Sequence, residues 1–187
     1  MTPLELPVLI VDDQPAVVQA LELLLDLNGI PHVAATTPDE ALEAARSRQL
    51  GAVIQDMNFT PQETSGDEGI SLFHDLREAQ PGVPILVMTA WGSIETAVEL
   101  VKDGASDYLE KPWNDDKLVA TLRNLLRLRS LELENTRLRT ELTESRADLA
   151  ERFELRGLVY ASEAMHRVVQ LAVNVADSDA PVLITGA

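Results

Sequence analysis

The chain of 187 residues contains no cysteine, which excludes disulfides, zinc-thiolate sites and thiol nucleophiles. No apolar run approaches the roughly 20 residues that a membrane-spanning helix needs, so no membrane association is expected. The N-terminal sequence MTPLELP lacks the basic and apolar regions of a signal peptide, and a cytoplasmic location is predicted.

Basic residues are scarce, with 15 Lys and Arg against 31 Asp and Glu and a net charge of −16. Non-specific DNA binding needs clustered cations, so bare nucleic acid is not an expected ligand.

The acidic charge is concentrated in the first two thirds of the chain. Residues 1–117 contain 21 acidic and 6 basic side chains, whereas residues 118–187 contain 10 and 9. In the first segment, short apolar runs such as PVLIV, GAVIQ and PILVM alternate with amphipathic stretches of helical length. This alternation is typical of an α/β domain, and it predicts five parallel strands with five flanking helices. Helix ends are expected at Gly29, Gly82 and Gly104, and helix starts at Thr37 or Pro38 and at Ser93.

Polar side chains stand at the carboxyl ends of four of the predicted strands. In an open parallel sheet these ends meet at one edge, where the site lies. Three carboxylates at one edge repel one another unless a cation joins them, and an all-oxygen set of ligands suits Mg²⁺. An Asp-Asp pair alone is also an ordinary helix cap, but polar residues at successive strand ends favour a metal site. These residues are Asp12 and Asp13, Asp56, Thr89 and Lys111.

The segments VDD, IQDMN, VMTA and YLEKP, in this order, resemble the motifs of a bacterial response-regulator receiver domain. The resemblance covers about residues 5–128. It implies a flavodoxin-like fold of strand order 2-1-3-4-5 and phosphoryl transfer from a sensor histidine kinase to an aspartate. By motif position Asp56 resembles the phosphoacceptor, Asp13 the direct Mg²⁺ ligand and Asp12 a second acidic residue that acts directly or through water. Asn58 would lend its backbone carbonyl to the metal.

The resemblance also assigns the residues that respond to the phosphoryl group. Lys111 and Thr89 would bind the phosphoryl oxygens, and the Thr89 hydroxyl would draw the following loop inward. Tyr108 resembles the family's switch aromatic, although it also suits an ordinary half-buried strand position. Because two anions must meet in the transfer, the positive charges of Mg²⁺ and Lys111 are needed at the transferred oxygens. Such a protein is a signalling switch and not an enzyme.

Two features depart from the receiver pattern. The segment NFTPQETSGDEG after Asp56 is longer than the family's usual turn and predicts an acidic loop, with Gly69 as the expected helix-opening glycine. This loop either shapes kinase choice or a dimer contact, or is a tolerated surface insertion. Trp91 stands two residues after Thr89. We hypothesise that its ring hinders the water that would hydrolyse the aspartyl phosphate.

The apolar period changes after residue 118. The segment LRLRSLELENTRLRTELTESRADLAERFEL has no Gly or Pro, which predicts a long helix continuing the fifth receiver helix. A heptad seam predicts a coiled-coil homodimer, and Asn at an a position favours a dimer of two parallel helices. Flanking charges form attractive pairs between two such helices, although exposed i,i+4 charges on a single helix imitate this pattern. The seam residues are Leu128, Leu131, Asn135, Leu138, Leu142 and Leu149.

The last thirty residues predict a helix capped by Ser162 and a buried strand VLIT before Gly186. Through SEAM and VLITG this segment resembles the start of the AAA+ ATPase domain of NtrC-like, sigma-54-dependent activators. The resemblance implies that the full-length protein contacts sigma-54 RNA polymerase and DNA through parts outside these 187 residues. Whether the receiver represses or activates the ATPase stays open, and a helix-strand cap on a complete protein is the alternative. The expected domains are the receiver (5–128), the coiled-coil linker (129–156) and a truncated ATPase edge (157–187).

A competing hypothesis is a haloacid-dehalogenase-like phosphohydrolase, because DMNFT imitates its Asp-x-Asp-x-Thr motif. That motif needs a second carboxyl group to protonate the leaving group, and Asn58 occupies this place. The nucleophilic strand of such an enzyme should also come first in the fold, whereas Asp56 follows the third predicted strand. Multiple turnover of phosphate esters would favour the hydrolase, and stoichiometric phosphorylation would favour the switch.

Overall fold

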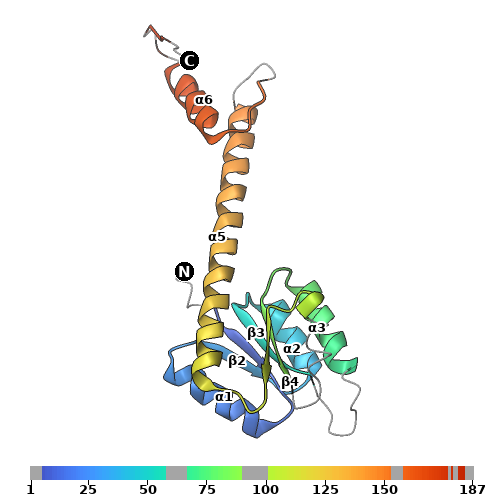
Figure 1. The fold of residues 1–187 in the computed structure, drawn as a ribbon. Coiled ribbons are helices and arrows are strands. Elements are labelled where there is room, and N and C mark those ends of the chain that lie inside the picture. Colours follow the sequence, from blue (N-terminus) through green and yellow to red (C-terminus); the bar gives the residue numbers. More distant parts are fainter. Residues whose placement is uncertain are drawn as a thin grey trace. The chain divides into compact units, whose positions relative to one another are not determined.

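The computed structural model describes residues 6–57, 67–89, 101–152, 158–176, 178 and 181–183. The chain divides into two compact units, Met1–Leu133 and Glu134–Ala187. The first unit contains a parallel five-stranded sheet of order β2-β1-β3-β4-β5, which confirms the predicted topology (Figure 1). The strands are β1 (Val8–Val11), β2 (His32–Ala35), β3 (Ala52–Asp56), β4 (Ile85–Thr89) and β5 (Asp107–Glu110).

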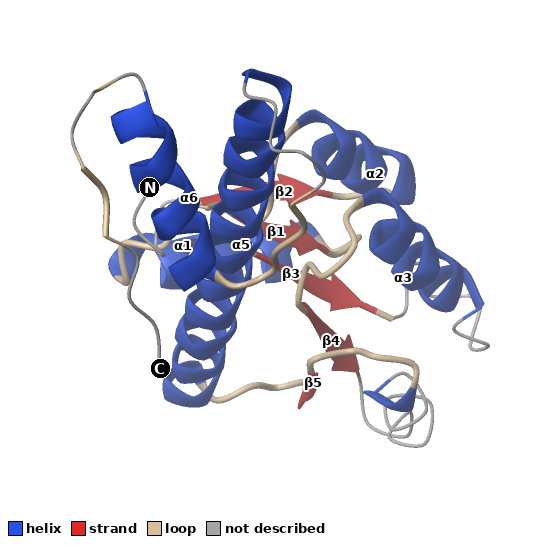
Figure 2. Cartoon of the chain, turned by 90° about the horizontal axis from the view of Figure 1, so that it is seen from above, coloured by secondary structure: helices blue, strands red, loops and turns tan. Residues whose placement is uncertain are grey.

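Helices cover both faces of this sheet. Figure 2 shows α2 and α3 on one face and α1 and α5 on the other. The predicted fourth helix, over about 93–105, lies outside the described residues except near its end, where Val101 and Lys102 are helical. The described helices are α1 (Pro15–Leu27), α2 (Pro38–Ser47), α3 (Asp67–Ala79), α5 (Asp115–Arg152) and α6 (Glu163–Ala176).

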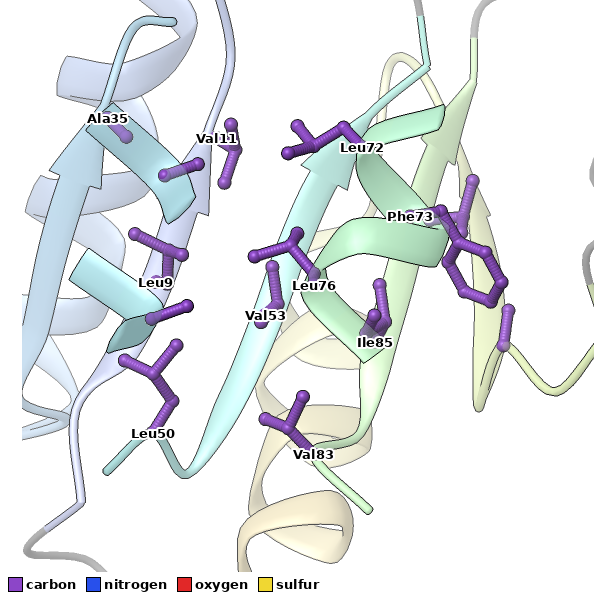
Figure 3. Close-up of a cluster of buried hydrophobic side chains, with 14 of the residues drawn as sticks. Leu9, Val11, Ala35, Leu50, Val53, Leu72, Phe73, Leu76, Val83 and Ile85 are labelled. Atoms are coloured by element: carbon purple, nitrogen blue, oxygen red, sulfur yellow. The ribbon is translucent and has the colours of Figure 1, made fainter. Parts of the chain in front are cut away.

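The central strands are buried along their whole length. Every residue of β1, β3 and β4 is buried, as expected of parallel strands with helices on both faces. Side chains alternate between the faces, so Val53 packs towards Leu72 and Leu76 of α3 (Figure 3). Ile54, the next residue, belongs to the cluster formed with α1 and α5.

The predicted glycine positions are confirmed, with one change. Gly29, Gly82 and Gly104 have φ angles of 65°, 81° and 104°, which glycine adopts without strain at helix ends and turns. Helix α3 is described from Asp67, so Gly69 lies in its first turn and not at its first described residue. Gly69 is needed for a different reason, because a Cβ there would lie 2.5 Å from the carbonyl oxygen of Met57.

Helix α5 runs without interruption for 38 residues, which confirms the predicted continuation of the last receiver helix. Its first turns pack on the sheet through buried leucines, including Leu118 and Leu122. Further along, Leu128, Leu131 and Leu138 are 58%, 59% and 53% exposed. Asn135 is exposed, Leu149 is half-buried, and the side chain of Leu142 lies outside the described part. The predicted seam is therefore mostly uncovered within one chain, and its pairing with a second chain stays a prediction.

The second unit contains α6, which begins as expected at a serine cap. Ser162 Oγ accepts a hydrogen bond from Met165 N at 3.2 Å.

The predicted strand VLIT is not formed in its described part, since residues 181–183 have no strand pairing and Val182 and Leu183 are 61% and 87% exposed. A single strand without a neighbour has no partner for its backbone hydrogen bonds. The ranges predicted for the three domains stay predictions. Among the described helices, none combines the length and apolarity needed to cross a bilayer.

Candidate functional site

The polar residues predicted from the strand ends meet at one edge of the sheet. Asp12 directly follows β1, Asp56 ends β3, Thr89 ends β4 and Lys111 directly follows β5. Asp12 and Thr89 are fully buried and Asp56 is 1% exposed. The parallel topology brings these ends together because all five strands point in the same direction.

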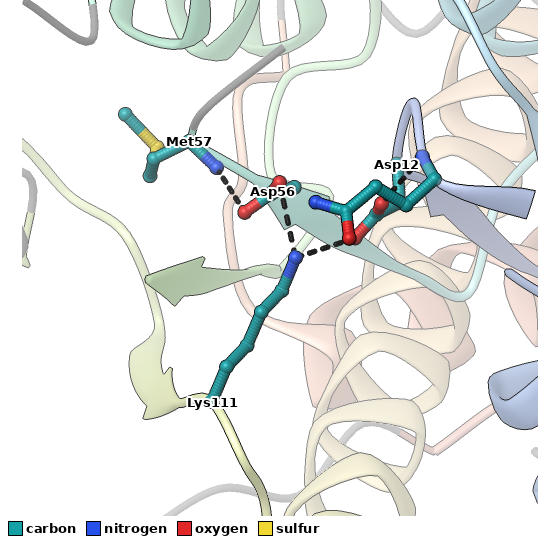
Figure 4. A network of polar contacts seen from close by, with 5 residues as sticks. Asp12, Asp56, Met57 and Lys111 are labelled. Carbon is teal, nitrogen blue, oxygen red and sulfur yellow. Dashed lines mark hydrogen bonds and ion pairs between the residues drawn. The ribbon is translucent and has the colours of Figure 1, made fainter. Parts of the chain in front are cut away.

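Lys111 lies between two carboxylates (Figure 4). Its Nζ is 2.7 Å from Asp12 Oδ2 and 3.0 Å from Asp56 Oδ2. The family resemblance implied that Lys111 would bind phosphoryl oxygens, and in the structure its ammonium offsets part of the negative charge of the two aspartates. Charge-assisted contacts of this length are the strong ones in proteins.

Two backbone groups fix the directions of these carboxylates. Met57 N donates to Asp56 Oδ1 at 2.9 Å, and Gln14 N donates to Asp12 Oδ1 at 2.9 Å. Sequence reasoning missed both residues, because a backbone N–H carries no residue-type signal. It also missed Gln55, which is fully buried, although a polar residue directly after the apolar run AVI, still within the predicted strand, was a visible signal.

The three aspartates fit a magnesium ion. Asp12, Asp13 and Asp56 each offer a carboxylate oxygen, and these oxygens lie within 4.8 Å of one another. Within the described residues, the buried Asp13 Oδ1 meets no hydrogen-bond donor, and the buried Asp56 Oδ2 is contacted by Lys111 Nζ at 3.0 Å. A hard cation with oxygen ligands would satisfy both atoms.

The pKa shifts of Asp56 and Asp13 indicate that the negative charge of the aspartate cluster is only partly neutralised. Burial raises the pKa of Asp56, although the neighbouring Lys111 ammonium opposes the rise. Burial also raises the pKa of Asp13, and repulsion from the Asp12 carboxylate adds to the effect. Both carboxylates are thus less favourably ionised than in water, as expected where a cation belongs.

The other residues predicted for the site are Thr89, Tyr108, Asn58 and Trp91, and the structure describes the first two. Lys111 N donates to Thr89 O at 2.8 Å, so the backbones of these two residues are joined. Tyr108 is half-buried in β5, and its switch role stays a prediction. Asn58 and Trp91 lie outside the described residues.

Comparisons with known proteins agree with this geometry. The pattern of the response regulator receiver domain family matches residues 8–123. The C4-dicarboxylate transport transcriptional regulatory protein DctD of Pseudomonas aeruginosa is 35% identical over 96% of this chain and 36% of its own length. The first curated relatives are named as transcriptional regulatory proteins, and the chain spans 36–38% of their length.

Solved structures extend the likeness. The N-terminal signal receiver domain of a two-component response regulator from Bacteroides fragilis is 32% identical, with a TM-score of 0.58, and the match covers 64% of this chain and 95% of that one. NtrX from Brucella abortus, solved in complex with ATP, is 26% identical, with a TM-score of 0.63, over 92% of this chain and 35% of that one.

None of these matches supports the phosphohydrolase alternative, and Asp56 ends the third strand of the sheet and not the first. The family model matches residues 8–123, and the strand order and the carboxylates and lysine at the strand ends are consistent with that match. The chain belongs to the response regulator receiver domain family.

Proposed function

We propose that Asp56 is the phosphoacceptor of a two-component response regulator and that Mg²⁺ is bound by Asp12, Asp13 and Asp56, together with the Asn58 carbonyl. The observation that carries the proposal is the position of Lys111 Nζ, within 3.0 Å of both Asp12 and Asp56. A buried carboxylate beside a fixed ammonium, and near the unsatisfied Asp13 Oδ1, suits a reaction in which negative charge accumulates.

The proposed reaction transfers one phosphoryl group from a histidine kinase. A carboxylate oxygen of Asp56 forms a bond to phosphorus, and the bond between phosphorus and the imidazole nitrogen of the donor breaks, returning its electron pair to the ring. Met57 N holds Asp56 Oδ1 at 2.9 Å, which orients the nucleophile. Lys111 supplies positive charge to the transferred oxygens and exchanges part of its contact with the aspartates for the phosphoryl group. The metal ion, when bound, adds positive charge at the same oxygens.

The transfer is proposed to act as a switch and not as a catalytic cycle. The buried Thr89 would bond the phosphoryl group through its hydroxyl, and Tyr108 would turn inward with it. Trp91 would slow hydrolysis by hindering water. The cytoplasmic location predicted from the sequence is part of this proposal.

The linker is proposed to join two copies of the chain. Leu128, Leu131 and Leu138 form an exposed apolar stripe on α5, and such a stripe at heptad spacing is stabilised by burial against a second helix. Within one chain Arg137 pairs with Glu141 at 2.8 Å, so charges of this helix already have local partners. The apolar seam is therefore the stronger argument for the dimer.

In the full-length protein we propose that the receiver and linker control an AAA+ ATPase that acts on sigma-54 RNA polymerase. Support comes from the SEAM and VLITG segments, and from the match to NtrX in complex with ATP over 92% of this chain. The contacts with nucleotide, polymerase and DNA would then be made by parts of the full-length protein outside these 187 residues.

The proposal is tested with acetyl phosphate and Mg²⁺, followed by intact mass measurement. We expect the wild-type protein to gain one phosphoryl group and Asp56→Asn to gain none. Continuous release of phosphate from simple phosphate esters would contradict the switch and favour a hydrolase.

A separate measurement by analytical ultracentrifugation, with and without beryllofluoride and Mg²⁺, tests the linker. Monomers at micromolar concentration in both states would refute the coiled-coil dimer.

A further inference from the structure

Gln55 is a polar residue buried in an apolar strand, directly before Asp56. Side chains alternate along β3, so Gln55 points to the face covered by α2 and α3, opposite to Asp56. Its cross-strand partners are Val11 of β1 and Val87 of β4. A fully buried amide between two valines lowers stability unless its polar atoms are hydrogen-bonded.

The Gln55 amide reaches the first turn of α3. Its Nε2 donates to the carbonyl oxygen of Gly69 at 2.6 Å, and because a carbonyl only accepts, the nitrogen end of the amide must face Gly69. The other end, Oε1, is buried and meets no donor in the described part of the chain. An unsatisfied buried acceptor is unfavourable, so the stability of the fold alone does not explain a glutamine here.

Gly69 places the same turn against the backbone that carries Met57. A Cβ on Gly69 would lie 2.5 Å from Met57 O and 2.9 Å from Met57 Cα, so this close approach requires glycine. Met57 N in turn donates to Asp56 Oδ1 (Figure 4). Met57, whose N–H orients the carboxylate, thus has its Cα and carbonyl group packed against the first turn of α3.

We propose that Gln55 and Gly69 are positioning residues for the phosphoacceptor. By tying α3 to the end of β3, they fix the Met57 N–H and through it the direction of the Asp56 carboxylate. The inference rests on the proposed role of Asp56 and adds to it two residues that neither bind metal nor touch the phosphoryl group. A displacement of a reacting group by about 1 Å can lower a rate about 100-fold, so a loosened tie should slow the transfer.

The test uses Gln55→Met, which keeps an unbranched side chain of similar length and removes the donor. The maximal rate of Asp56 phosphorylation at saturating acetyl phosphate and Mg²⁺ should fall about tenfold, since the nucleophile is less well oriented. The Mg²⁺ concentration for half-maximal rate should change less than about twofold, because the carboxylates of Asp12 and Asp13 are untouched. Urea unfolding should show little change in stability, because removal of the unsatisfied Oε1 offsets the loss of the hydrogen bond to the Gly69 carbonyl.

Val53→Ala is the matched control. Val53 lies two residues earlier on the same face of β3, within the same apolar cluster. Its truncation should lower stability and leave the phosphorylation rate within about twofold, because orientation of the nucleophile is unaffected. A structural role for Gln55 predicts the opposite pattern, in which rate follows stability in both variants.

Gly69→Ala gives a second route, and it carries the same comparison if Gln55→Met does not fold. Its Cβ displaces the Met57 carbonyl, so the maximal rate should fall while the half-saturating Mg²⁺ concentration is kept. A wild-type rate in Gln55→Met, or an equal loss of rate in Val53→Ala, would overturn the inference alone. If the wild-type protein takes no phosphoryl group at Asp56, the proposed function fails as well.

Discussion

Replacing Asp13 by asparagine should make the metal-free protein more stable. The buried Asp13 Oδ1 meets no hydrogen-bond donor among the described residues, and burial and the Asp12 charge raise the pKa of Asp13. At neutral pH the ionised carboxylate is therefore unfavourable in the folded state. Asparagine keeps the shape of the side chain and an accepting oxygen but removes the charge.

Burial is the main cause of the raised pKa of Asp13, and repulsion from Asp12 adds a contribution whose size follows from the geometry. The carboxylate oxygens of the cluster lie within 4.8 Å of one another; at that separation two unit charges repel by about 0.9 kcal/mol in water and about 3.5 kcal/mol at an effective dielectric constant of 20. Asp13 is half-buried and is attracted by Lys111. We therefore expect the free energy of unfolding to rise by about 1 kcal/mol, near the aqueous end of this range.

The pH dependence has a definite sign. Because the pKa of Asp13 is higher in the folded than in the unfolded state, the unfolded state loses its proton first, and the wild-type protein loses stability as pH rises above the ordinary value of 3.8. The advantage of Asp13→Asn should therefore be present at neutral pH and disappear below that value.

The assay is urea unfolding in EDTA and in Mg²⁺. A site-bound ion at 100 times its Kd stabilises by about 2.7 kcal/mol; the wild-type protein should show a gain of this kind and Asp13→Asn a much smaller one. Glu43→Gln, which removes an exposed charge on α2, controls for net charge and should change neither value. Asp13→Asn that is less stable than wild type in EDTA, or that keeps the full gain from Mg²⁺, would refute the reasoning.

Three further predictions concern other contacts. Gln80→Ala should lower the free energy of unfolding by about 2 kcal/mol, measured in urea, because the Gln80 side chain bonds the carbonyls of Ala45 and Arg48 and the Leu50 N–H; an unchanged midpoint would contradict it. Lys111→Met should lower the phosphorylation rate about 100-fold or more, measured with acetyl phosphate, and a rate within twofold of wild type would exclude its proposed role. Leu131→Glu should dissociate the linker dimer in sedimentation experiments, since like charges would face each other at the seam, whereas a persistent dimer would place the interface elsewhere.

Much of the fold follows from residue patterns alone. The runs containing Ile10, Ile54 and Leu86 are apolar on both faces, which only a strand between two helical layers accommodates. Once the strands are parallel and in this order, the positions of Asp12 and Asp56 at a shared edge are a consequence of topology. The aspartates and Lys111 were therefore predictable before their distances were known.

Other features depend on tertiary contacts that residue types do not encode. The Met57 N–H orients Asp56 through a backbone group that residue type does not reveal. The close approach of Gly69 to Met57 depends on how α3 packs against the end of β3. The VLIT segment has strand composition, but its described residues, Val182 and Leu183, pair with no strand in the described part of the chain. Local propensity predicts an element, whereas its partners decide whether the element exists.

The most direct test of the central claim is chemical trapping of the phosphorylated residue. The protein is treated with acetyl phosphate and Mg²⁺, reduced with borohydride to convert an aspartyl phosphate to homoserine, and digested for mass spectrometry. We predict homoserine at Asp56 alone, and no conversion when Mg²⁺ is withheld. Conversion at another aspartate, or none at Asp56 in the presence of Mg²⁺, would contradict the assignment of this site as the phosphoacceptor.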